Sequence, residues 1–183
     1  MNVGKRELEV VRIAGKVADA PTLVLLHEGL GSVSAWREFP QALAARTGLP
    51  ALVYSRYGNG RSDVLAEKRT PRYMHDEALV VLPELLERCE VRDSVLIGHS
   101  DGASIALIYA AEHGAGVRGI VLEAPHVFVE ELSVQSIVAA KTVYESTDLR
   151  ERLGRHHADA DRTFYGWNDI WLDPAFRDWN IEA

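Results

Sequence analysis

The sequence predicts an α/β fold in which a mostly parallel sheet carries helices on both faces. Four short, continuous apolar runs are typical of strands buried on both faces, and helical or turn-rich segments separate them in a repeating order. The chain has 183 residues, 47% hydrophobic and 26% charged, which suits one globular domain with a real core. The four apolar runs begin at Leu23, Ala51, Val95 and Gly119.

The first half of the chain alternates between strand and helix signals. Residues 7–13 alternate apolar and charged side chains, as an edge strand would, and residues 23–26 follow as a buried strand. Residues 34–46 place apolar side chains at helical spacing, and Pro40 marks where that helix starts. Residues 51–54 form the next predicted strand.

The pattern continues to Pro125 and then changes. The clearest helix follows Pro71, because its apolar positions recur every three or four residues: Ala78, Leu82, Leu85, Leu86 and Cys89. Strands at 95–97 and 119–122 flank an Ala-rich helix at 103–113. After Pro125 only helical signals remain.

Composition excludes several classes of function. With 27 acidic and 20 basic residues the formal net charge is −7, so the chain lacks the basic surface of a general nucleic-acid binder. Cys89 is the one cysteine, which excludes an intrachain disulfide and a multi-cysteine zinc site. No apolar run reaches the length of a signal peptide or a membrane span. We therefore expect a cytoplasmic protein without nucleic-acid or membrane partners.

The chemistry concentrates at residues 98–102, which read Gly98-His99-Ser100-Asp101-Gly102. This Gly-x-Ser-x-Gly motif lies between a predicted strand and a predicted helix, the context in which it forms a nucleophile elbow. The turn would present the Ser100 hydroxyl at a helix N-terminus, where backbone N–H groups and the helix dipole favour negative charge. We expect Ser100 to have a positive φ and the Asp101 N–H to stabilise an oxyanion.

Two further segments complete a resemblance to the α/β-hydrolase family. Residues 27–31, His-Glu-Gly-Leu-Gly, resemble its oxyanion loop, and residues 55–62 resemble its Gly-x-Gly-x-Ser turn. The resemblance covers nearly the whole chain and implies that the Gly29 N–H is the second oxyanion donor. It also implies a division into residues 1–125, the N-terminal part of the hydrolase core, and residues 126–183, a helical lid.

The same resemblance implies a Ser-acid-His triad, with the acid and the His following the lid. Neither of the strands that would carry them is recognisable here, so we expect the chain to be an N-terminal portion of such an enzyme. Glu123 could serve as acid or line the pocket, and His126 could serve as base or line the pocket. On this view the strand at 119–122 is an exposed sheet edge, through which we expect self-association.

The remaining sequence patterns do not indicate a further catalytic or cofactor site. His156 and His157 are adjacent, so on a helix they diverge and predict a solvated face rather than a metal site. No nucleotide-binding loop is complete, and we expect no metal or cofactor. The aromatic residues of the lid predict a small core of its own, with one or two of them lining an apolar acyl pocket: Phe164, Tyr165, Trp167, Trp171, Phe176 and Trp179.

The expected function is hydrolysis of a carboxylic ester or related carbonyl substrate through an acyl-enzyme on Ser100. The substrate would be a small molecule, and turnover by this chain alone would be slow because a serine without its base is a weak nucleophile. Two alternatives stay open: a non-catalytic module that binds a small ligand on the same fold, and a C–C bond hydrolase or haloperoxidase-like activity that uses the same elbow.

Overall fold

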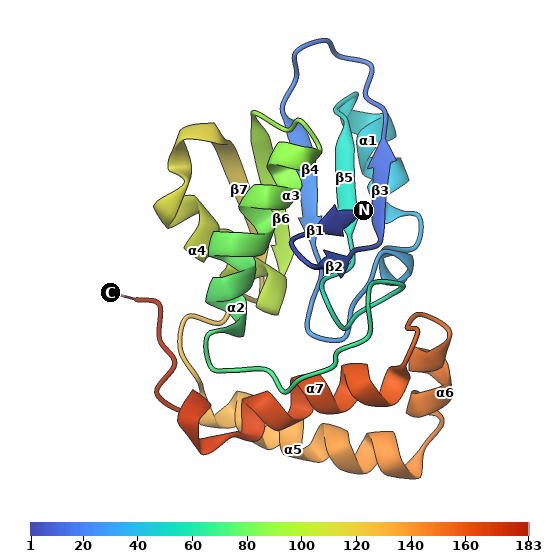
Figure 1. Ribbon diagram of the computed structural model, residues 1–183, viewed down its shortest axis with the longest axis vertical. Coiled ribbons are helices and arrows are strands. Elements are labelled where there is room, and N and C mark those ends of the chain that lie inside the picture. Colours follow the sequence, from blue (N-terminus) through green and yellow to red (C-terminus); the bar gives the residue numbers. More distant parts are fainter. Residues whose placement is uncertain (183) are drawn as a thin grey trace.

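A computed structural model describes residues 1–182; Ala183, the last residue of the predicted lid, lies outside them. A five-stranded sheet runs in the order β3–β5–β4–β6–β7 (Figure 1). The parallel strands are β4 (Thr22–Leu26), β5 (Ala51–Tyr54), β6 (Ser94–His99) and β7 (Val117–Glu123). The edge strand β3 (Val10–Ile13) is antiparallel to β5, and β1 (Asn2–Val3) pairs with β2 (Arg6–Glu7) in a separate ribbon. The four predicted parallel strands and the edge strand are therefore confirmed.

Helices cover both faces of the sheet, as predicted. One face carries α2 (Tyr73–Asp76), a π-helical turn (Glu77–Val81), α3 (Leu82–Arg88) and α4 (Asp101–Glu112), and the other carries α1 (Phe39–Thr47). Alternation along β4 explains this division: Val24 and Leu26 belong to the apolar cluster of α3 and α4, whereas Leu23 and Leu25 belong to that of α1. The helix predicted at 103–113 starts two residues earlier, because it begins directly after the Ser100 turn.

The C-terminal helices form a layer across one end of the sheet (Figure 1). They are α5 (Glu131–Ser146), α6 (Leu149–Gly154) and α7 (Ala160–Leu172), followed by a 3₁₀ turn (Pro174–Phe176). This end is the one toward which the parallel strands point, and there the α/β architecture places its functional loops. We call the three helices the cap; the boundary at residue 125 stays a prediction.

An aromatic cluster holds the cap together. Phe164, Trp171 and Phe176 are fully buried, and Phe164 stacks on Tyr144 with 3.8 Å between ring centroids. The prediction that these side chains form a small core of the lid's own is only partly right, because Trp171, Phe176 and Trp179 belong to the same apolar cluster as the sheet and α4. Among residues 1–182, no helix has the length and apolar character that crossing a membrane requires.

Candidate active site

The segment 98–102 forms a sharp turn between β6 and α4. Ser100 has φ 52° and ψ −120°, which confirms the predicted positive φ, and α4 begins at the next residue. Glycine is required at both flanking positions because neighbouring backbone atoms lie too close to leave room for a Cβ. A Cβ at Gly98 would collide with the backbone of Ala103, and one at Gly102 would collide with the carbonyl of Leu26. The two glycines thus let the turn pack against both β4 and α4.

A histidine contacts the Ser100 side chain. His126 Nε2 lies 3.2 Å from Ser100 Oγ, within hydrogen-bond distance. The position of His126 is fixed by Ser104, whose Oγ accepts from the His126 N–H at 3.0 Å and donates to the His126 carbonyl at 2.6 Å. The His126 ring packs edge-on against Trp171, with centroids 4.6 Å apart. The structure therefore brings one of the predicted pocket residues to Ser100.

No carboxylate completes this pair within residues 1–182. His126 Nδ1 is buried and has no hydrogen-bond partner there. Glu123 contributes its backbone, since its carbonyl accepts the Ser100 N–H at 2.9 Å, while Glu123 itself is exposed and its side chain forms no hydrogen bond. The His126 ring thus lacks the orienting acid that a triad base has.

The loop at residues 27–31 is held by its carbonyl groups. Arg56 donates through Nη1 to the His27 carbonyl and through Nη2 to the Glu28 carbonyl at 3.0 Å. Asn59 Nδ2 lies 3.1 Å from the carbonyl oxygens of both Gly29 and Gly31. Arg56 and Asn59 are 2% and 1% exposed. These contacts fix the peptide planes of the loop from one side.

Two N–H groups are left free by this arrangement. In the described part of the chain, neither the Gly29 N–H nor the Asp101 N–H donates a hydrogen bond. The Asp101 N–H is at the N-terminus of α4, where such groups have no intrahelical partner and the dipole favours an anion. Both predicted donors therefore lack a partner among residues 1–182, and their role as oxyanion donors stays a prediction.

Sequence reasoning missed the residues that hold the loop. Arg56 and Asn59 lie in the segment 55–62, which was recognised only as a family motif; the motif was the signal that could have pointed to them.

The prediction of a solvated face for His156 and His157 is wrong for His157, which is 2% exposed. Its Nδ1 accepts from the Gly60 N–H and its Nε2 donates to the Leu30 carbonyl, both at 2.9 Å.

The electrostatics of the loop follow from burial. Burial lowers the pKa of His27 well below its usual value, with Arg56 acting in the same direction, and burial also lowers the pKa of His157. Burial raises the pKa of Glu28, whose Oε2 accepts the Leu30 N–H at 2.5 Å. The loop is therefore held by neutral imidazoles and hydrogen-bonded carbonyls.

The cap contacts the site through one face of α7. Trp167 lies over Gly29, so that a Cβ on Gly29 would collide with the indole, and Trp171 packs on His126. This confirms that Trp167 and Trp171, four residues apart, share a helical face. Whether they line an acyl pocket stays a prediction.

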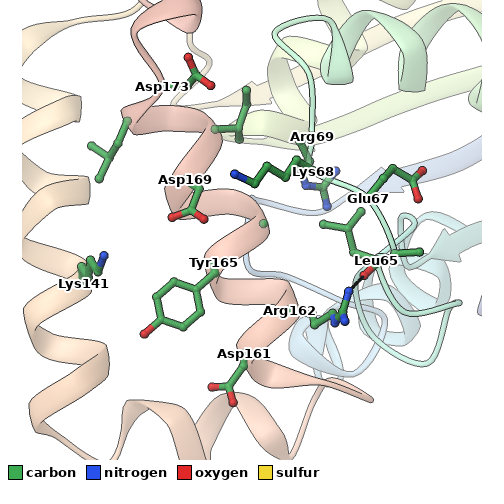
Figure 2. A pocket seen from close by; sticks show the side chains of 14 residues that line it. Leu65, Glu67, Lys68, Arg69, Lys141, Asp161, Arg162, Tyr165, Asp169 and Asp173 are labelled. Carbon is green, nitrogen blue, oxygen red and sulfur yellow. Dashed lines mark hydrogen bonds between the residues drawn. The ribbon is translucent and has the colours of Figure 1, made fainter.

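Two cavities lie near this arrangement. The larger, about 590 Å³, lies between residues 65–69 and α7 (Figure 2), and Ser100 does not line it. The smaller, about 170 Å³, is bordered by the loop residues His27 and Glu28 and by Trp36 and His99. In residues 1–182, no group of three or more His, Cys, Asp or Glu is placed to hold a metal ion. The smaller cavity is the one that adjoins the loop with the free Gly29 N–H.

Comparisons with known proteins agree with this geometry. A family model described as the alpha/beta hydrolase fold matches residues 21–175. Curated relatives include proline iminopeptidases from Lactobacillus helveticus, 31% identical over 112 residues, and from Saccharolobus solfataricus, 36% identical over 101 residues. These matches span 61% and 55% of this chain, and 38% and 32% of the two enzymes. The chain thus matches well under half of the length of these relatives.

Solved structures show the same architecture at lower identity. An α/β hydrolase enzyme from a Medee basin deep-sea metagenome library superposes with a TM-score of 0.71, at 19% identity, over 97% of this chain and 71% of its own. A structure from a study of carboxylesterases of Nitrososphaera gargenis gives a TM-score of 0.69, at 19% identity, over 97% and 72%. At this identity the likeness concerns the fold alone.

Proposed function

The chain belongs to the α/β-hydrolase family, and from this premise we propose that it is a serine hydrolase acting on a carboxylic ester or a related acyl substrate. One observation supports the proposal: Ser100 stands at a strained turn directly before the Asp101 N–H, and neither this group nor the Gly29 N–H has an acceptor among residues 1–182. Strained backbone at a nucleophile and free donors nearby are typical of acyl-transfer sites.

The proposed reaction starts with attack of Ser100 Oγ on the carbonyl carbon. The carbonyl oxygen becomes an oxyanion, which the Gly29 and Asp101 N–H groups stabilise; each such donor is worth about 3–4 kcal/mol in comparable enzymes. The proton of Ser100 passes to a base, and the alcohol or amine leaves with a proton as the acyl-enzyme forms. Water then cleaves the ester on Ser100 and regenerates the hydroxyl.

His126 has a limited role in this proposal. Its Nε2 is near enough to Ser100 to accept the proton, but no carboxylate orients the ring or stabilises the imidazolium. We propose that His126 lines the acyl site and supports only slow turnover. That the acid and His of the full triad lie outside these 183 residues stays a prediction.

The substrate class follows from the walls of the site. Trp167 and Trp171 offer apolar surface above Gly29 and His126, which suits an apolar acyl or leaving group. The curated relatives named above are iminopeptidases and a structural neighbour comes from a carboxylesterase study, so we propose an ester or a small amide. A C–C bond hydrolase or haloperoxidase-like reaction would use the same elbow.

Labelling with a fluorophosphonate, read by mass spectrometry, tests the nucleophile. We expect one adduct, on Ser100, absent in Ser100→Ala and unchanged in Ser136→Ala, which removes an exposed hydroxyl on α5. With p-nitrophenyl acetate we expect slow, Ser100-dependent turnover that falls by a further ~10²-fold in His126→Ala if His126 takes the proton. Equal labelling and turnover in Ser100→Ala would instead favour the non-catalytic, ligand-binding alternative.

A further inference from the structure

Arg69 lies between the two halves of the proposed oxyanion hole. On one side its Nη2 donates to Asn59 Oδ1 and to the Tyr57 carbonyl, both at 3.1 Å. Asn59 in turn donates to the carbonyls of Gly29 and Gly31. The guanidinium is therefore one hydrogen-bonded residue away from the Gly29 carbonyl, which belongs to the peptide directly after the one that carries the Gly29 N–H.

On its other side Arg69 reaches the elbow. Its Cζ lies 5.3 Å from the centroid of the Tyr73 ring, within the range of a cation–π contact. The Tyr73 hydroxyl donates to Asp101 Oδ2 at 2.8 Å, and Asp101 is 1% exposed. Asp101 carries the other proposed N–H donor. One guanidinium thus contacts a supporting residue of each donor.

No carboxylate of residues 1–182 forms a direct ion pair with this cation, although the charges of Asp101 and Glu77 act to raise its pKa. Arg69 forms no ion pair there, and its Nε is buried without a hydrogen-bond partner. Burial lowers its pKa, which shows that the environment disfavours its charge. Arg69 is partly buried, and partial removal of a charge from water without an ion pair is unfavourable, so a residue that only filled space at this position would be better apolar.

We propose that Arg69 is a positioning residue that sets the Gly29 and Asp101 N–H groups relative to each other. The inference rests on the proposed function, since it concerns the same oxyanion hole. Arg69 touches neither Ser100 nor the reacting carbonyl in this scheme; it acts through Asn59 and Tyr73. Because displacement of a catalytic group by about 1 Å can lower a rate about 10²-fold, its loss should affect the rate more than the affinity.

The large cavity makes a specific test practicable. Arg69 and Lys68 line this cavity of about 590 Å³ (Figure 2), and Gly166 of α7 also belongs to its lining. A Cβ on Gly166 would lie 3.8 Å from Arg69 Nε and 2.5 Å from Cδ2 of Leu65, so the guanidinium and the Leu65 side chain both face this point of the helix. A small guanidinium ion should therefore reach the space that a truncated Arg69 leaves.

The first measurement is the rate constant for fluorophosphonate labelling of Ser100 in the full chain. We expect Arg69→Ala to lower it ~10- to 100-fold, Arg69→Lys to lower it less, and Lys68→Ala, which alters the same cavity, to leave it unchanged. Methylguanidinium at millimolar concentration should restore the Arg69→Ala rate with saturation. A purely structural role would lower the melting temperature without this rescue of rate, and that result would overturn the proposal.

The second measurement does not need a reactive Ser100. In ¹⁵N-labelled protein, Arg69→Ala should shift the amide resonances of both Gly29 and Asp101, and methylguanidinium should return them toward their original positions. Failure of labelling in the unaltered chain, with these shifts present, would contradict the proposed function and leave the positioning role supported. Unmoved Gly29 and Asp101 resonances in both Arg69→Ala and Arg69→Lys would overturn the inference.

Discussion

Gly29 shows how a single residue can set both the chemistry and the packing of the site. It supplies a free N–H, and it is also the point where the cap meets the loop, because Trp167 occupies the space where a Cβ would be. A side chain here would displace either the loop or the indole. The contact therefore makes the proposed oxyanion donor sensitive to the position of α7.

We expect Gly29→Ala to destabilise the fold by about 1–3 kcal/mol, the usual penalty of overpacking, and to slow labelling of Ser100. Removing the indole should relieve the first effect, so that Gly29→Ala/Trp167→Ala is less destabilised than the sum of the two single variants. Urea unfolding of all four proteins measures the coupling free energy. Strict additivity would show that Trp167 and Gly29 do not share this space.

Single site residues could be predicted from the sequence only where a short motif marks them. Ser100, Asp101 and Gly29 could be predicted as site residues because short motifs and their position after predicted strands point to them, and their roles stay predictions. Arg56, Asn59 and His157 could not be predicted, because their partners are about 30, 30 and 100 residues away in sequence. A hydrogen bond over such a distance depends on how the loops pack, which no single-segment pattern contains.

At the scale of elements, the loop at residues 27–31 depends on two neutral imidazole rings. His27 Nε2 accepts from the Arg56 N–H at 3.0 Å, and His157 Nδ1 accepts from the Gly60 N–H at 2.9 Å. Protonation would turn each acceptor into a donor facing an N–H. The lowered pKa values of both rings follow from burial, and they predict how acid affects this loop.

We expect the free energy of unfolding to fall as the pH is lowered from 7 to 5.5. Unfolded histidines take up protons near their ordinary pKa of 6.5, whereas His27 and His157 in the folded chain resist protonation. Below that pH the unfolded state therefore binds more protons, with a slope of up to about 1.4 kcal/mol per pH unit for each ring.

The test of this pH dependence compares two adjacent positions. His157→Asn should reduce the slope measured by urea unfolding, and His156→Asn should keep it. Burial raises the pKa values of Glu28 and Glu77, so these residues make the free energy of unfolding rise as the pH falls. Their contribution is the same in all variants and therefore cancels when the slopes are compared. The same slope in His157→Asn as in the unaltered protein would contradict the prediction.

Regular elements were more predictable than their details. Continuous apolar runs located β4, β5, β6 and β7, because a strand that is buried on both faces consists mostly of apolar residues. The three-and-four spacing after Pro71 located a helical segment whose five apolar positions are all buried. The π-helical turn at Glu77–Val81 was not predicted; within it the buried Glu77 side chain accepts from the Tyr54 hydroxyl at 2.7 Å, a contact between residues far apart in the sequence.

For the whole molecule, the strand order leaves β7 at one edge of the sheet. Ile120 and Val121 of this strand are 39% and 57% exposed, and α5 nearby in the chain exposes Leu132 at 75%. An edge strand offers unpaired N–H and C=O groups, and adjacent exposed apolar side chains favour pairing with another chain. Self-association through this edge stays a prediction. The prediction depends on the exposed edge of the sheet and not on the candidate site.

We expect sedimentation velocity to show concentration-dependent association of the chain in the micromolar range, and Val121→Lys to weaken it. A lysine on an edge strand opposes pairing because its charge would have to be buried between two sheets. Val17→Lys is the matched control, since Val17 is 53% exposed but lies between β3 and β4, away from β7. If both variants weakened association equally, added charge alone would explain the effect, and a monodisperse monomer at all concentrations would contradict the prediction outright. Because Ser100 and the loop at 27–31 lie outside β7, labelling of Ser100 should be the same in Val121→Lys, which separates assembly from chemistry.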